Sequence, residues 1–206
     1  NYQLAELLLE HKAFDAAAAE YERTAYTYAA HDKAPAAGYA AVYAHRESAK
    51  IAAPAGRDRI RREVIRSSLK FVDTFPKHDK ATIVLGAAAD DLYEMKDYAP
   101  ALTVAQRLLT QYPAAEAALR RSAWIVVAHA SFDLQKYPDA EAGYNQVLQL
   151  TARDDKTTEA ITDNLAASIY KQGEQAAKLE DYKTAARHFL RIAQAAPNSK
   201  IRPTAE

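Results

Sequence analysis

Four segments of the chain share one short pattern. An aromatic residue is followed three positions later by alanine, and four positions further on usually by a second aromatic residue. Steps of three and four place all three residues on one face of a helix. The recurrence of such a face is typical of stacked repeats, in which each unit buries its apolar side against its neighbours. The segments are Phe14-Ala17-Tyr21, Tyr98-Ala101-Ala105, Tyr137-Ala140-Tyr144 and Tyr182-Ala185-Phe189.

Further positions of the repeat appear when the four aromatic residues are aligned. A small residue lies nine positions before each of them, and a large apolar residue lies thirteen before three of them. Proline lies fifteen positions after two of them, where it ends a helix. We therefore predict pairs of antiparallel helices in which the small residue lets the second helix approach closely. The small residues are Ala5, Ala89, Ala128 and Gly173, the large ones Leu85, Trp124 and Ile169, and the prolines Pro113 and Pro197.

The interval between the first and second of these segments is long enough for a fifth pair, although the aromatic pattern is missing from it. We expect its first helix from Pro35 to Ile51 and its second from Arg57 to Phe75, with Pro76 ending the pair. No segment shows the sustained alternation of a strand. The fold class is therefore predicted to be all-α, with helix pairs over residues 1–31, 35–76, 79–113, 114–152 and 157–197.

The composition argues against the common catalytic and cofactor sites. The chain has 27 basic and 27 acidic residues and no cysteine, which excludes disulfides, thiolate metal sites and cysteine nucleophiles. The five glycines are scattered singly, so no phosphate-binding loop is present, and no serine stands in a nucleophile elbow. The six histidines lack metal-ligand spacing, and no apolar run is long enough to span a bilayer. We predict a protein that is not an enzyme and that needs no metal or cofactor.

The helix pairs, joined by short polar turns, resemble the tetratricopeptide repeat (TPR) family over nearly the whole chain. The long spacing between units, with Thr74-Phe75-Pro76 and Gln111-Tyr112-Pro113 at unit ends, looks like the bacterial envelope subgroup of outer-membrane assembly lipoproteins and Tol-associated coordinators. The resemblance implies a single α-α superhelix over residues 1–206. It also implies a scaffold that binds a peptide or protein partner in its concave groove or along its helix ridges.

The same resemblance implies a place in envelope assembly or maintenance. It suggests the bacterial periplasm or the periplasmic face of the outer membrane, with the cytoplasm as the alternative. The chain begins without methionine and ends abruptly, so we expect it to be a piece of a longer protein. Any membrane association would then come from missing parts or from partners.

In this family the first helix of each pair lines the groove, and transfer of that pattern gives candidate partner-binding residues. Several tyrosines fall on first helices, where they suit recognition because each offers a large apolar surface and one hydroxyl. Packing between neighbouring first helices explains them equally well. The lysine and asparagine clamp of co-chaperone members is not recognisable, which disfavours binding of chaperone tails. The groove candidates are Glu6, Asp90, Tyr93, His129, Phe132, Tyr170 and Glu174.

One helix also carries a run of basic residues within positions 57–70. Arg59, Arg62, Arg66 and Lys70 are spaced three and four apart and form a basic stripe, opposite an apolar face. A solvated outer helix face accounts for this stripe more simply than a binding site does. The alternative function is an adaptor that binds nucleic acid or an anionic lipid surface through the stripe. The neutral chain as a whole offers no general attraction to such partners.

Overall fold

The computed structural model describes residues 1–29, 31–152 and 155–201. These ranges contain α-helices and one short 3-10 turn, and no strand. The chain divides into two compact units, Asn1–Met95 and Lys96–Glu206. The all-α fold class predicted from the sequence is confirmed for the described residues, whereas a single solenoid over residues 1–206 stays a prediction.

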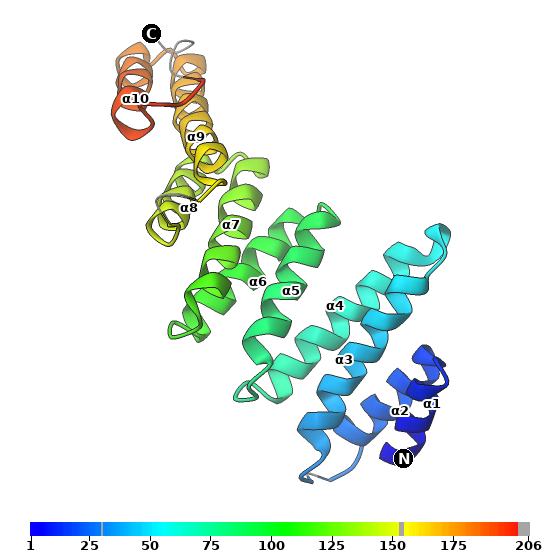
Figure 1. The fold of residues 1–206 in the computed structure, drawn as a ribbon. Helices are drawn as coiled ribbons and strands as arrows, with labels where there is room; N and C mark the ends of the chain where they lie inside the picture. Colours follow the sequence, from blue (N-terminus) through cyan, green and yellow to red (C-terminus); the bar gives the residue numbers. More distant parts are fainter. Residues whose placement is uncertain (30, 153–154, 202–206) are drawn as a thin grey trace. The chain divides into compact units, whose positions relative to one another are not determined.

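The described residues of the first unit form five helices, each of which packs against the next along the chain (Figure 1). A 3-10 turn, Pro54–Gly56, lies in the connection between Ile51 and Arg57. Proline fits the first position of this turn because its ring fixes φ near the helical value. The helices are α1 (Tyr2–Glu10), α2 (Phe14–Tyr26), α3 (Ala34–Ile51), α4 (Arg57–Thr74) and α5 (Ala81–Glu94).

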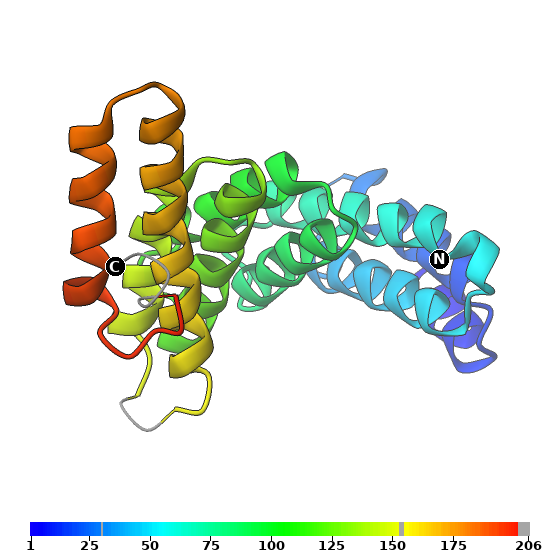
Figure 2. The ribbon, with the colours of Figure 1, turned by 90° about the horizontal axis from the view of Figure 1, so that it is seen from above.

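The second unit repeats this arrangement, and successive helices again pack side by side (Figure 2). Because α5 belongs to the first unit and α6 to the second, the pairing predicted over residues 79–113 also stays a prediction. The linker residues Arg153 and Asp154, and the end of the chain from Arg202, lie outside the described residues. The helices are α6 (Tyr98–Gln111), α7 (Ala117–Asp133), α8 (Tyr137–Gln149), α9 (Thr158–Lys178) and α10 (Tyr182–Ala195).

The repeated pattern forms the core in both units. Ala17 and Ala140 are fully buried, and Tyr21 and Tyr144, one helical turn further on, are 2% exposed. The small residues allow the close approach that their positions predict. A Cβ atom on Gly173 in α9 would lie 2.4 Å from Cε1 of Phe189 in α10, so only glycine leaves room for this ring.

The helix ends follow the expected chemistry. Phe75, Tyr112 and Ala196 end α4, α6 and α10 and have left the helical conformation, with ψ between 57° and 64°; each directly precedes a proline, which disfavours helical backbone at that position. The short turns instead contain one residue in the left-handed region, with φ between 58° and 62°. Non-glycine residues rarely adopt this conformation, so each turn stores some backbone strain. These four residues are Lys12, Lys96, Gln135 and Glu180.

Candidate functional site

The first unit has a surface hollow where α3, α4 and α5 converge. Its volume is about 500 Å³. Val64 of α4 is 2% exposed and forms part of its apolar lining, while Tyr43 of α3 is 47% exposed and presents its ring to solvent. The lining residues are Tyr43, Arg46, Glu47, Ala49, Lys50, Arg61, Val64 and Asp91. The hollow therefore combines one accessible aromatic ring with charged groups from three helices.

Ion pairs connect these charged groups across the helices. Arg46 of α3 donates to Asp91 of α5 at 2.9 Å, and this pair is partly shielded from solvent. Arg61 of α4 lies 3.2 Å from Glu94, also in α5. Ion pairs that solvent can reach contribute little to stability, so a charged group of a partner can replace one member at a small cost. The walls can therefore offer both cationic and anionic groups to a bound chain.

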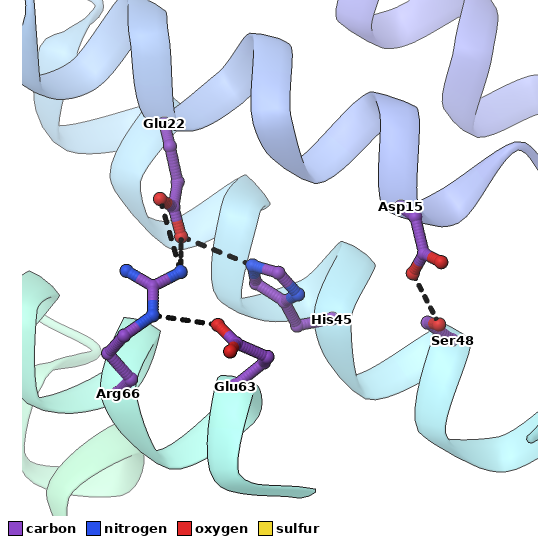
Figure 3. Close-up of polar contacts among 6 residues, drawn as sticks. All are labelled: Asp15, Glu22, His45, Ser48, Glu63 and Arg66. Carbon is purple, nitrogen blue, oxygen red and sulfur yellow. Dashed lines mark hydrogen bonds and ion pairs between the residues drawn. The ribbon is translucent and has the colours of Figure 1, made fainter. Parts of the chain in front are cut away.

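A second polar network, between α2, α3 and α4, fixes two of the helices that form the hollow (Figure 3). Glu22 of α2 contacts His45 of α3 at 3.1 Å and accepts from Arg66 of α4 at 3.1 Å. Arg66 also donates to Glu63 at 2.7 Å. The hydrogen bond with His45, followed by the charge of Arg66, lowers the pKa of Glu22 to about 2. Glu22 therefore stays ionised at neutral pH and links three helices.

The predicted groove residues of the first unit lie apart from one another. Glu6 is exposed on α1, whereas Asp90 and Tyr93 lie on α5 next to the lining residue Asp91. Partial burial, followed by the charges of Asp91 and Glu94, raises the pKa of Asp90. Asp90 and Tyr93 thus share a helix with the lining residue Asp91 but do not line the hollow themselves, and their part in binding stays a prediction.

The predicted groove residues of the second unit mostly contact the partner helix of their own pair. Nδ1 of His129 lies 2.7 Å from the hydroxyl of Tyr144, and burial lowers the pKa of His129. Phe132 and Tyr170 pack their rings against residues of α8 and α10, with ring centroids 5.2 Å apart in each case. These contacts favour a packing role for the three rings.

Glu174, the last predicted groove residue of the second unit, contacts a residue of its own helix. It accepts from Lys171, one turn earlier on α9, at 2.5 Å. This contact joins two residues of the same helix surface and crosses to no neighbouring helix. The use of Glu174 in partner binding stays a prediction.

Some first-helix tyrosines of the first unit pack against other rings, and one is exposed to solvent. Tyr2 meets Tyr21 edge to face at 5.6 Å, and Tyr39 contacts Phe71 at 6.0 Å. The packing thus joins the first helix to the second helix of the same pair, whereas the sequence suggested packing between neighbouring first helices. Tyr43 alone of these three first-helix tyrosines is strongly exposed.

The basic stripe divides into two halves. Arg59 and Arg62 are exposed on the amino-terminal half of α4. Arg66 is engaged by Glu22 and Glu63, and Nζ of Lys70 lies 4.0 Å from the centroid of the Tyr26 ring, a cation–π contact. The stripe is therefore a continuous row in the sequence, but its second half, Arg66 and Lys70, is engaged by side chains of α2.

The sequence did not single out the hollow. Arg61 belongs to the same basic run as the stripe, Arg46 and Lys50 precede that run on α3, and Asp91 follows the predicted Asp90. Their convergence depends on where α3 and α5 meet, across 45 positions between Arg46 and Asp91. No spacing rule within one helix could have found it.

The described parts of the chain contain no cluster of three or more side chains suited to holding a metal ion. Within those same parts, no helix combines the length and the apolar character needed to cross a membrane.

Comparisons with known proteins identify the fold. No protein-family model matches the chain, and no curated protein matches it. Two solved structures of MamA are similar. One is a MamA RS-1 double mutant, with a TM-score of 0.51 and 15% identity over 94% of this chain and 90% of that one. The other is MamA from residue 41 onward of Desulfovibrio magneticus RS-1, with a TM-score of 0.50 and 16% identity over 97% and 95%.

A third similar structure is a STAND signal-transduction ATPase with a tetratricopeptide repeat sensor from Pyrococcus horikoshii. The TM-score is 0.51 and the identity 17%, over 98% of this chain and 33% of that one. At these identities the likeness concerns the fold, which is of the tetratricopeptide-like α-α superhelix class.

Proposed function

We propose that the chain is a non-catalytic scaffold that binds a segment of a protein partner at the hollow between α3, α4 and α5. The observation that carries this proposal is Tyr43, whose exposed ring stands at a hollow of about 500 Å³ with charged groups of both signs in its walls. Tyrosine is a frequent anchor in protein interfaces because it buries a large area at a low cost in side-chain entropy.

The chemistry of the walls defines the kind of segment that fits. Arg46 and Asp91 can open their ion pair and bind a carboxylate and an amino or guanidinium group of the partner. An extended peptide with charges of both signs beside an apolar side chain would match the walls and Tyr43. A purely apolar helix would remove water from the ion pairs of the walls without offering them any polar group, which is costly.

The cellular location is part of the same proposal. The resemblance to the bacterial envelope subgroup supports a role in envelope assembly or maintenance, in the periplasm or at the periplasmic face of the outer membrane. We do not extend the proposal to nucleic acid or lipid surfaces, because Arg66 and Lys70 are held by Glu22, Glu63 and Tyr26.

The test is a selection from a random peptide library, followed by calorimetric titration of the selected peptides. We expect Tyr43→Ala to weaken binding at least about tenfold, as for an interface anchor. Tyr28→Ala is the matched control, because Tyr28 is 49% exposed on a different surface of the same unit and should leave the affinity within about twofold. Equal affinity of the wild type and Tyr43→Ala for every selected peptide would refute the proposed site.

A further inference from the structure

A recess lies in the first unit at the end of α3 and α4 that is opposite their connection (Figure 1). It is formed by the start of α3, the end of α4 and the segment that leads to α5. Its volume is about 430 Å³, which is large enough to hold part of a bound peptide. The lining residues are Pro35, Thr74, Phe75, Pro76, Lys77 and His78.

The two rings of the recess are held in place by other rings behind them. Phe75 stacks on Tyr26 of α2 with centroids 6.0 Å apart, and it lies 5.9 Å from Phe71. His78 meets Phe71 edge to face at 5.0 Å, and Phe71 is fully buried. Phe75 and His78 are themselves half-buried, so each keeps part of its surface accessible. The recess is therefore preformed, and a ligand would not have to order these rings on binding.

The edge of the recess is positively charged. Lys77 is exposed, and none of the described lining residues is acidic. Asp73 and Asp79 flank the lining segment in the sequence but do not line the recess, and Asp79 is paired with Lys80 at 3.2 Å. A ligand of the recess would therefore meet apolar rings beside a cationic group.

We propose that the recess binds an extended, proline-rich segment of a protein partner that carries acidic residues beside its prolines. Aromatic-lined grooves bind polyproline II segments because these segments are extended before binding and lose little conformational entropy. The rings of Phe75 and His78 and the two lining prolines offer such a surface. An acidic residue of the segment would lie against Lys77, which selects acidic segments over basic ones.

This site is separate from the hollow between α3, α4 and α5. The two share no lining residue, because the hollow uses the second half of α3 and the first half of α4. The two sites can therefore fail separately.

Fluorescence anisotropy tests the proposal with the full chain and a labelled peptide of three Asp-Pro-Pro-Pro repeats. A peptide of three Asp-Gly-Ser-Gly repeats keeps the charge and the length but lacks the polyproline II conformation. A peptide of three Lys-Pro-Pro-Pro repeats keeps the conformation and reverses the charge. We expect both of these to bind at least about tenfold more weakly than the acidic proline peptide.

Two variants of the recess test the charge and the ring. Lys77→Glu should weaken binding of the acidic proline peptide at least about threefold at low salt. Arg59→Glu is the matched control, because Arg59 is exposed at the other end of α4 and its reversal changes the net charge by the same amount. Phe75→Leu keeps an apolar side chain but removes the ring, and it should weaken binding about fivefold. Circular dichroism should show the same helix content for all of these proteins.

Tyr43→Ala distinguishes the recess from the hollow. Tyr43 lines the hollow and not the recess, so this variant should bind the acidic proline peptide like the wild type. Loss of binding in Tyr43→Ala would place the peptide in the hollow and would overturn the proposal. The same holds if the wild type does not bind the acidic proline peptide, if it binds the Asp-Gly-Ser-Gly peptide equally well, or if Lys77→Glu and Phe75→Leu both bind like the wild type.

Discussion

Gly143 gives the sharpest test of the packing between α7 and α8. A Cβ atom at this position would lie 2.9 Å from Cβ of Ala128, 3.0 Å from its Cα and 3.1 Å from its backbone nitrogen. Two of these three atoms belong to the backbone of α7, so no side-chain rotation can relieve the clash. Gly143→Ala must therefore push the two helices apart.

The expected magnitude combines two opposing effects. Overpacking of a well-packed core costs about 1–3 kcal/mol. Alanine in place of glycine inside a helix returns about 1 kcal/mol. We therefore expect Gly143→Ala to lower the free energy of unfolding of the second unit by up to about 2 kcal/mol. Without the close approach of α7, the same substitution would raise the free energy of unfolding by about 1 kcal/mol. The sign of the measured change therefore distinguishes the two cases.

The assay uses the single tryptophan of the chain. Trp124 lies in α7 one helical turn before Ala128 and packs against the core of the second unit, so its fluorescence during urea unfolding reports on that unit. Adding Ala128→Gly removes only the clash with Cβ, and the two close approaches to the backbone remain. The double variant should therefore recover the packing loss only in part, and its measured stability also includes a cost of about 1 kcal/mol for glycine inside α7. A Gly143→Ala protein more stable than the wild type would refute the reasoning.

Two further predictions concern a charge and a turn. The pKa of Glu22 is lowered to about 2 from an ordinary value of 4.5, so its contribution is fully present above pH 4.5 and is lost as the pH falls toward 2. Glu22→Gln should therefore lower stability at pH 7 by about 1–3 kcal/mol and flatten the pH dependence between those values, as urea titrations at several pH values would show; an unchanged pH profile would contradict this. Gln135 adopts a φ of 59°, so Gln135→Gly should relieve strain and raise stability by up to about 1 kcal/mol, whereas a loss of stability in thermal unfolding would count against a strained turn.

The helices could be predicted from the sequence because the signals that define them are local. The aromatic, the alanine and the second aromatic of Tyr137-Ala140-Tyr144 lie within one helix, and Ala140 and Tyr144 are buried as their spacing indicates. Prolines near the ends of α4, α6 and α10 act within their own segments. Even the pair without the aromatic pattern, α3 and α4, lies within a residue of its predicted limits.

The candidate site was less predictable because it depends on how the helices meet. Tyr39 and Tyr43 are the same residue type one turn apart on α3, and helical periodicity treats them alike. Tyr39 packs against Phe71, near the carboxyl end of α4, and against His78, whereas Tyr43 stands at the hollow lined by Val64 from the first half of α4. Only the position of α4 along α3 separates a packing tyrosine from an exposed one.

The basic stripe shows again that contacts between helices cannot be predicted from the spacing within one helix. The spacing of Arg59, Arg62, Arg66 and Lys70 correctly predicts residues that follow one side of a helix, but it cannot show what faces them. Glu22, which engages Arg66, comes from α2, 44 positions away. With Arg66 and Lys70 held by α2, the exposed remainder of the stripe is Arg59 and Arg62. Two arginines release few counterions on binding a phosphate backbone, so salt-sensitive binding through the stripe alone would be weak. The hollow between α3, α4 and α5, with an aromatic ring and charges of both signs, is the stronger basis for recognition.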